Sequence, residues 1–168
     1  MPKLAQLQHP DPMHLKAAAG WIQLGDYDSA NDELENIRAE CRAHPDVLDL
    51  RWFIYSHHEQ WDACLDITSA IVKMAPDRVS GWIHKAISLR RANGRGFEKA
   101  KGLLLEAAKL FPEDGMIQYN LACYSAQLGQ LDATKEYLHK SYELGDAKQI
   151  KLTALDDDLK PLWDGALN

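Results

Sequence analysis

The chain has 168 residues and a formal net charge of −6, with 46% hydrophobic and 26% charged residues. These values are typical of a soluble globular protein with one core, and the acidity argues against a general nucleic-acid-binding protein. No apolar run approaches the roughly 18 residues of a membrane span, and the first residues lack the apolar stretch of a signal peptide. We therefore expect a cytoplasmic protein in which Cys41, Cys64 and Cys123 are reduced thiols of the core.

The N-terminal stretch predicts a helical hairpin. The letters HPDPMH place Asp11 as the N-cap of a first helix and Pro12 at its first position. Gly25 supplies the left-handed residue that ends this helix, and the phrase GDYDSA opens a second one. The turn at Pro45 comes three residues later than the corresponding turns further on, so we expect the second helix to be three residues longer here.

The phrase that opens the second helix returns three times along the chain. Each copy closes on a small residue, and the spacings between these residues are 34, 36 and 34; they are Ala30, Cys64, Ala100 and Thr134. A period near 34 residues is typical of stacked helical hairpins, because one hairpin alone cannot bury both of its faces.

The C-terminal tail predicts a cap for the last hairpin. Asp146, with Gln149 three residues on, has the pattern of a capping box that begins one more helix. We expect Leu159, Leu162 and Trp163 to pack back on that helix, and the acidic run 156–158 to form a solvated turn with capping capacity.

The repeat resembles the tetratricopeptide repeat (TPR), and the tail resembles that of small bacterial TPR-only proteins. The resemblance covers about residues 11–146 and is clearest in YNLACYSAQLG, from Tyr119 to Gly129. Two residues depart from the repeat pattern: Trp52 replaces a small residue at a close helix contact, and Glu59 replaces the turn glycine.

The resemblance implies an all-α fold, a right-handed α-solenoid superhelix of four hairpins plus a C-terminal capping helix. We expect one TPR domain over residues 1–168, with repeats at about 11–44, 45–78, 79–114 and 115–146 and a cap at 147–168.

The residues do not form a recognisable catalytic, cofactor or metal site. NGRG at residues 93–96 does not follow a strand, so we interpret it as a turn and not as a phosphate loop. His57 and His58 are adjacent on a helix and point about 100° apart, so they cannot both bind one ion in regular geometry. We therefore expect a protein that is not an enzyme and has no cofactor and no metal.

In TPR proteins, the first helices of the repeats line a groove that binds a partner. Carried over by repeat position, the resemblance implies a peptide-binding groove of Lys16, Gln23, Asp49, Phe53, His57, Ile83, His84, Arg91, Tyr119, Asn120, Cys123 and Gln127. Amide, aromatic and cationic side chains of this kind suit a peptide main chain and a carboxylate.

Residues 78–109 form a basic block in an acidic chain, with eight basic and two acidic side chains. Arg90 and Arg91 complement the dipole of their helix end in one interpretation, and meet an acidic partner in another. We expect a peptide with an acidic group or a C-terminal carboxylate to bind near His84 and Arg91, while Asn120 holds its main chain.

The sequence therefore favours a non-catalytic scaffold that binds a protein or peptide in its groove, and not a nucleic acid or a membrane. The alternatives are a dedicated chaperone or regulatory subunit of a bacterial secretion or assembly system, a small-molecule-binding or enzymatic role of the groove, and homodimerisation.

Overall fold

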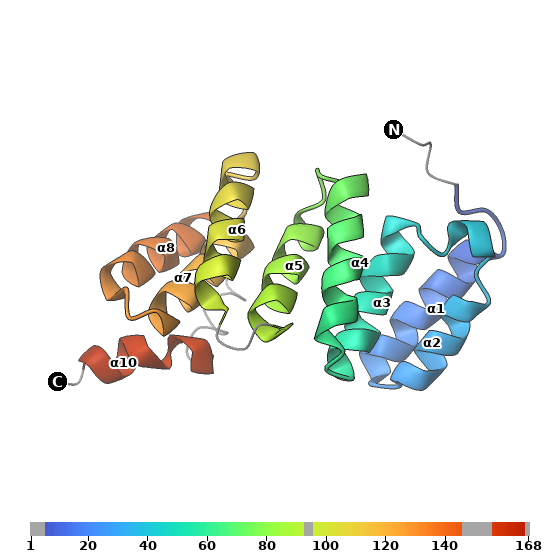
Figure 1. Ribbon diagram of the computed structural model, residues 1–168, viewed down its shortest axis with the longest axis horizontal. Coiled ribbons are helices and arrows are strands. Elements are labelled where there is room, and N and C mark those ends of the chain that lie inside the picture. Colours follow the sequence, from blue (N-terminus) through green and yellow to red (C-terminus); the bar gives the residue numbers. More distant parts are fainter. Residues whose placement is uncertain (1–5, 93–95, 146–155, 167–168) are drawn as a thin grey trace. The chain divides into compact units, whose positions relative to one another are not determined.

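A computed structural model describes residues 6–92, 96–145 and 156–166 of the chain. Every regular element in these residues is a helix, as predicted (Figure 1). The chain forms two compact units, an N-terminal unit of Met1–Ser88 and a C-terminal unit of Leu89–Asn168, with the boundary inside one helix. The interpretation as a single domain of four repeats stays a prediction.

The N-terminal unit contains two helical hairpins and most of a fifth helix. Its elements are α1 (Asp11–Leu24), α2 (Tyr27–Glu35), the 3₁₀ turn η1 (Ala39–Cys41), α3 (Pro45–His57), α4 (Trp61–Met74) and the start of α5 (Val79–Ala92). Helix α1 lies beside α2, and α3 lies beside α4 (Figure 1).

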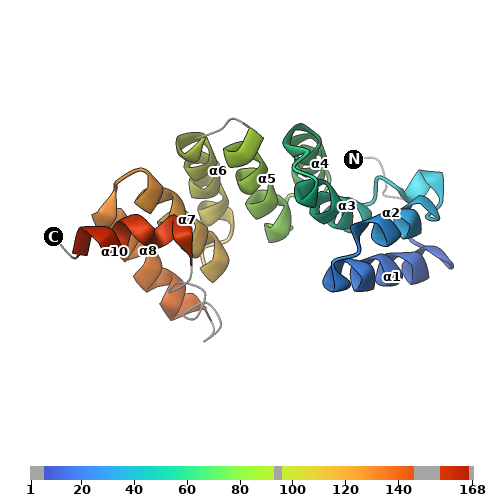
Figure 2. The same cartoon turned by 90° about the horizontal axis from the view of Figure 1, so that it is seen from below.

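The C-terminal unit contains the end of α5 and, in the described residues, five further elements. They are α6 (Phe97–Leu110), α7 (Gly115–Gln127), α8 (Leu131–Leu144) and the 3₁₀ turn η2 (Asp157–Leu159), which continues into α10 (Lys160–Ala166). Helix α7 contacts α6, α8 and η2, and Figure 2 shows α10 alongside α7 and α8.

The core confirms the register of the repeat. The small residues that close the four phrases, Ala30, Cys64, Ala100 and Thr134, are all 0% exposed. The close-contact position of each first helix is also buried, at Ala18, Trp52, Ala86 and Ala122. The three cysteines are buried and unpaired, as predicted.

The turns between paired helices need one residue in the left-handed conformation. Gly25 and Gly129 adopt it, with φ of 78° and 71°, as the sequence predicts. Glu59 takes the same role in the second hairpin with φ of 55°, so the turn is kept although the glycine is missing. A residue with a Cβ incurs steric strain in this conformation.

The first hairpin differs from the prediction in two ways. Helix α2 is not longer but ends early at Glu35, because Arg38 has an extended backbone (φ −53°, ψ 140°) and the extra residues form η1. Asp11 is not the N-cap of α1, which is Pro10; Asp11 is the first residue of the helix and is 0% exposed.

A long-range ion pair explains both differences. Arg38 donates from Nη2 and Nε to Asp11 Oδ2 at 2.6 and 2.9 Å, and its backbone N–H donates to Asp11 Oδ1 at 3.1 Å. The carboxylate is satisfied from residue 38, and the side-chain hydrogen bond from Arg38 holds the pKa of Asp11 well below its ordinary value of 3.8 against the effect of burial.

The structure describes only the last part of the predicted cap. The predicted helix start at Asp146 lies outside the described residues. Leu159 and Leu162 are buried, at 0% and 7% exposure, in elements that contact α7 and, for α10, α8. Trp163 is 45% exposed, and the helix on which the sequence expects it to pack lies outside the described residues, so this expectation stays a prediction.

Candidate functional site

The N-terminal unit has a hollow on the face of its first helices. It has a volume of about 320 Å³ and is lined by Pro12, Leu15, Lys16, Ala19, Asp46, Asp49, Leu50 and Arg78. Lys16 and Asp49 belong to the set that the sequence assigned to a groove, and both line this hollow. Gln23, further along α1, is exposed. The hollow therefore combines an apolar floor with side chains of both charge signs.

Arg78 organises the acidic side of the hollow. Its guanidinium binds Asp46 through Nη2 and Asp49 Oδ2 through Nη1, the latter at 2.6 Å. Ser80 Oγ also donates to Asp49 Oδ2, at 3.3 Å. Burial raises the pKa of Asp49, but the neighbouring His84 and Arg78 together outweigh it and lower the pKa below 3.8. The carboxylate is therefore ionised at neutral pH.

An aromatic cluster adjoins this network. The rings of Trp52 and His84 stack with centroids 3.7 Å apart and planes 4° apart. Phe53 meets His84 edge-on at 5.3 Å and keeps 39% of its surface exposed. Ile83, the neighbour of His84 on α5, is half-buried. Phe53 is thus a predicted groove residue that offers a flat apolar surface to a ligand.

His84 faces a carboxylate of its own chain. Its Nδ1 lies 3.7 Å from Asp49 Oδ1, and both atoms are buried without a hydrogen-bond partner. A carboxylate from a binding partner would therefore compete with Asp49 for this side of the ring. The expected contact between His84 and a partner's acidic group stays a prediction.

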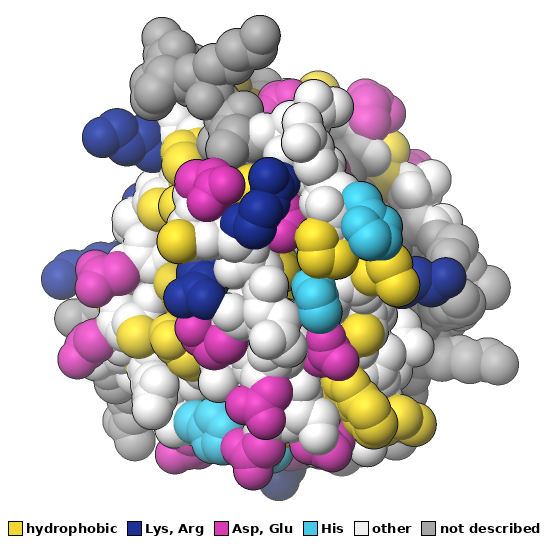
Figure 3. All heavy atoms as spheres, turned by 90° about the vertical axis from the view of Figure 1, so that its right-hand side faces the viewer, with side chains coloured by type: hydrophobic (Ala, Val, Ile, Leu, Met, Phe, Trp, Pro, Cys, Tyr) yellow, Lys and Arg dark blue, Asp and Glu magenta, His cyan; other side chains and the backbone are white. Residues whose placement is uncertain are grey.

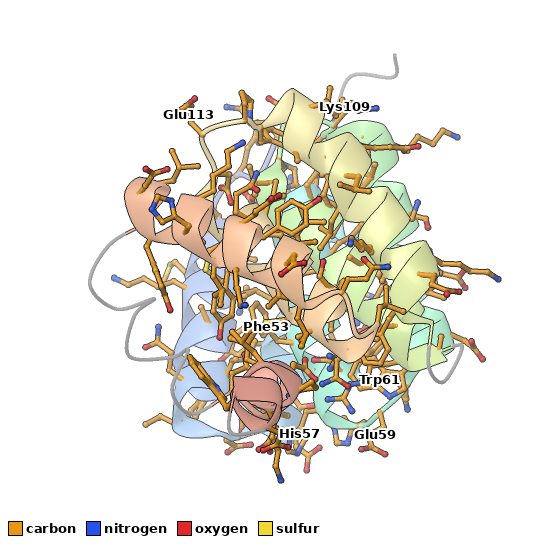
Figure 4. The ribbon with its side chains drawn as sticks, turned by 90° about the vertical axis from the view of Figure 1, so that its left-hand side faces the viewer. Phe53, His57, Glu59, Trp61, Lys109 and Glu113 are labelled. Atoms are coloured by element: carbon orange, nitrogen blue, oxygen red, sulfur yellow. The ribbon has the colours of Figure 1, made fainter. Side chains whose placement is uncertain are left out.

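His57 lies at the far end of α3, away from the hollow. Its ring stacks on Tyr27 with centroids 3.9 Å apart, and it lines a second hollow of about 310 Å³ with Asp26 and Asp28. Figure 4 labels it with Phe53 of the same helix, with Glu59 of the following turn and with Trp61, the first residue of α4. Within the described residues, no group of three or more His, Cys, Asp or Glu side chains is placed to hold a metal ion.

The end of the N-terminal unit formed by α1 and α2 does not present one continuous apolar patch. Figure 3 shows hydrophobic side chains in separate groups, divided by charged and polar ones, with histidine and acidic side chains together at its lower edge.

In the C-terminal unit, three of the predicted groove residues hold the chain's own tail. Tyr119 Oη donates to Asp156 Oδ2 at 2.7 Å, Cys123 Sγ lies 3.7 Å from the same oxygen, and Gln127 Nε2 donates to the Asp158 carbonyl at 2.9 Å. Tyr119 and Cys123 are consequently only 6% and 3% exposed. Burial, followed by the nearby acidic side chains, raises the pKa of both groups, so both are neutral donors at physiological pH.

The acidic run is therefore not the solvated turn that the sequence predicts. Asp157 is exposed, but Asp156 and Asp158 are half-buried, and Arg90 forms an ion pair with Asp158. The same guanidinium lies over the rings of Phe97 and Tyr124, at 5.2 and 5.7 Å from their centroids. The predicted capping is confirmed, since Asp156 Oδ1 accepts from the Asp158 N–H at 2.9 Å.

The remaining predicted groove residues of this unit have different surroundings. Asn120 is half-buried and its Nδ2 donates to the Met116 carbonyl at 2.9 Å, so the amide is engaged by its own helix. Arg91, at the end of α5, is exposed.

Sequence reasoning missed the importance of Arg78 and understated that of Arg90. Arg78 lies in the turn before α5, outside the repeat positions associated with a groove. Arg90 was interpreted through the helix dipole or an acidic partner, and not through the chain's own tail. The signal for each is a cation whose acidic partner is remote in sequence, 29 residues away for Asp49 and 68 for Asp158. Spacing within one repeat does not contain this information.

No protein-family model matches the sequence, and no curated protein matches it. The solved structures that are similar in fold include the following three. TTC0263, a thermophilic TPR protein of Thermus thermophilus, has a TM-score of 0.78 at 18% identity over 93% of this chain and 82% of its own. MamA from Desulfovibrio magneticus RS-1 has a TM-score of 0.67 at 14% identity over 95% and 92% of the two chains. Yeast Tom70 has a TM-score of 0.72 at 17% identity over 94% of this chain but 34% of its own.

The chain therefore has the fold of a tetratricopeptide repeat protein, an all-α solenoid of helical hairpins, as the sequence predicts. In the described part of the chain, no helix combines the length and the apolar character that crossing a membrane requires.

Proposed function

We propose that the protein is a non-catalytic scaffold that binds a segment of a partner protein on the face of α1 and α3. The observation that carries this proposal is the hollow of about 320 Å³, where Leu15 and Leu50 lie beside Lys16. Such a surface offers apolar contact area together with a charge that orients a ligand. The TPR fold supports this interpretation, because its first helices commonly present the binding face.

Lys16 is the cation of the hollow that is best placed for a ligand. Arg78 is already neutralised by Asp46 and Asp49, whereas Lys16 is exposed and forms no ion pair within the described residues. A partner segment with an acidic group or a C-terminal carboxylate would pair with Lys16, and its apolar side chains would cover Leu15 and the ring of Phe53. The buried unpaired cysteines support a reducing compartment such as the cytoplasm.

A peptide-display selection on the full chain tests this proposal. Enriched peptides are titrated against the wild type, against Lys16→Glu and Phe53→Ala, and against Lys73→Glu as a matched control on α4. We expect Lys16→Glu to weaken binding about tenfold and Lys73→Glu to leave it within about twofold, since only one charge meets the ligand. Affinity also falls as salt rises.

Equal losses in Lys16→Glu and Lys73→Glu would contradict a site on α1 and α3. If none of the selected peptides binds the folded wild-type chain in the titration, the proposal that the protein is a peptide-binding scaffold is contradicted.

A further inference from the structure

The tail segment Asp156–Leu159 lies on α7 as a bound peptide would. Four donors from the body of the C-terminal unit hold it: Tyr119 and Cys123 at the Asp156 carboxylate, Arg90 at the Asp158 carboxylate, and Gln127 at the Asp158 carbonyl. Three of these donors belong to the set that the sequence assigned to partner binding. The face that would receive a partner is therefore occupied by the chain itself.

The contacts define a recognition pattern. The first and third residues of the segment, Asp156 and Asp158, present carboxylates to donors, while Asp157 between them is exposed. Leu159 follows at 0% exposure. The docked segment thus has the pattern of an acidic residue, an exposed residue, an acidic residue and a buried apolar residue, in that order. Neutral Tyr119 and the cation Arg90 both favour carboxylates at these places.

The hold on the segment combines polar contacts with two buried leucines, Leu159 at 0% and Leu162 at 7% exposure. Arg90 and Asp158 keep 14% and 30% of their side chains exposed, so water reaches the ion pair. The helix that follows, α10, has seven residues, and its Trp163 stays 45% exposed. Elements held by few buried apolar side chains open at a lower free energy than the core does. A foreign segment with the same pattern would replace each contact with an equivalent one.

We propose that this surface of the C-terminal unit binds acidic segments of the form acidic–any–acidic–apolar in a partner protein, and that Asp156–Leu159 is its built-in competitor. This inference rests on the proposed scaffold function but concerns a different unit from the hollow at Lys16. The apparent affinity for the partner segment is then the intrinsic affinity multiplied by the fraction of chains in which the tail is displaced. Weakening the tail raises the affinity for the foreign segment.

The probe is a fluorescent synthetic peptide with the chain's own sequence DDDLKPLW, residues 156–163. Anisotropy is measured with the full-length wild type and with the double variant Asp156→Asn/Asp158→Asn, both checked for helix content by circular dichroism. We expect the double variant to bind the peptide about tenfold more tightly than the wild type, because its tail no longer competes. The peptide NNNLKPLW should bind neither protein.

Cys123 supplies a second readout that does not depend on the added peptide. It is 3% exposed beneath Asp156, so thiol labelling mapped by mass spectrometry reports displacement of the tail. The double variant should label Cys123 about tenfold faster, with Cys41 and Cys64 unchanged as internal controls, and the peptide DDDLKPLW should restore protection.

The variant Arg90→Gln distinguishes release of the tail from binding of the added peptide. It loosens the tail but also removes the donor that a foreign segment needs, so it should speed Cys123 labelling without gaining affinity for the peptide. The proposal is overturned if the double variant labels Cys123 at the wild-type rate, or if the peptide binds neither protein or both equally. If the tail opens but the peptide binds to neither protein, the tail is only a structural cap. That result would not affect the test of the scaffold at Lys16, which concerns the other unit.

Discussion

Trp52 donates its indole N–H to Ser88 Oγ at 2.9 Å, in an interior where both side chains are buried. The repeat pattern calls for a small residue at position 52, and the structure accommodates the indole because a small residue stands opposite it on α5. The ring also stacks on His84, which is part of the network beside the hollow. A departure from the repeat pattern thus connects the core of the N-terminal unit to its candidate site.

Ser88→Ala should destabilise the protein by about 1–3 kcal/mol, because the buried indole N–H loses its acceptor. The same substitution in a Trp52→Phe background should cost clearly less, since no donor is left unsatisfied there. Chemical denaturation of the four proteins of this cycle measures the difference. Ser69→Ala, at an exposed position of α4, is the control. Additive effects would mean that the hydrogen bond contributes nothing.

Substitution of two helical glycines by alanine should change the free energy of unfolding in opposite directions. In Gly81→Ala the new Cβ would lie 2.7 Å from Ile71 Cγ2, a stiff branched side chain that is 0% exposed, and overpacking should cost about 1–3 kcal/mol. In Gly102→Ala the Cβ meets nothing within 4 Å, and the gain in helix propensity should stabilise by about 0.5–1 kcal/mol. Thermal melting of both variants decides this, and shifts of the same sign would contradict the close approach of Ile71 to Gly81.

Asp11→Asn should lower the melting temperature at neutral pH. The pKa of Asp11 is lowered in the folded protein, mainly by the hydrogen bond from Arg38, so its contribution to stability is present above its ordinary pKa of 3.8. The contribution is lost as the pH falls below that value toward the lowered pKa. The difference in melting temperature between wild type and variant should therefore shrink in acid.

Asp32→Asn, at an exposed position of α2, removes the same charge and serves as the control. A difference between wild type and Asp11→Asn that persists unchanged in acid, or that Asp32→Asn reproduces, would contradict the ion pair as its cause.

Ala122→Leu tests the register of the repeat in the C-terminal unit. Ala122 is 0% exposed at the close-contact position of α7, so the larger side chain should cost about 1–3 kcal/mol by overpacking. Glu136→Leu, at an exposed position of α8, is the control. Equal denaturation midpoints for Ala122→Leu and the wild type would mean that the assigned repeat register is wrong by at least one residue.

The periodic part of the fold was predictable, because the small residues and turn residues recur at a fixed spacing and each acts locally. Ala30 and Gly25 could be placed in this way, whereas the sequence marked Glu59 only as a departure from the turn glycine and did not predict its left-handed conformation. What failed depends on pairs far apart in sequence. Arg38 leaves the helix because it binds Asp11, 27 residues away. The acidic tail docks because Arg90 and Tyr119 bind its carboxylates.

The candidate site likewise contains residues that the repeat pattern predicts and residues whose role depends on contacts remote in sequence. Lys16 and Asp49 line the hollow of the N-terminal unit, where the resemblance to TPR proteins placed a groove. Arg78, which sets the charge of that hollow, has no periodic signature, and the burial of Cys123 depends on a segment 33 residues further on.

The most direct test of the scaffold is residue-resolved NMR mapping of a selected peptide on the ¹⁵N-labelled full-length chain. A site on the first helices predicts that the largest amide shifts fall at residues 15–19 of α1 and 49–53 of α3. Lys16→Glu should clearly reduce these shifts at the same subsaturating peptide concentration, and Lys73→Glu should leave them in place. Shifts confined to α2 and α4, or shifts that Lys16→Glu leaves unchanged, would contradict binding on the face of α1 and α3.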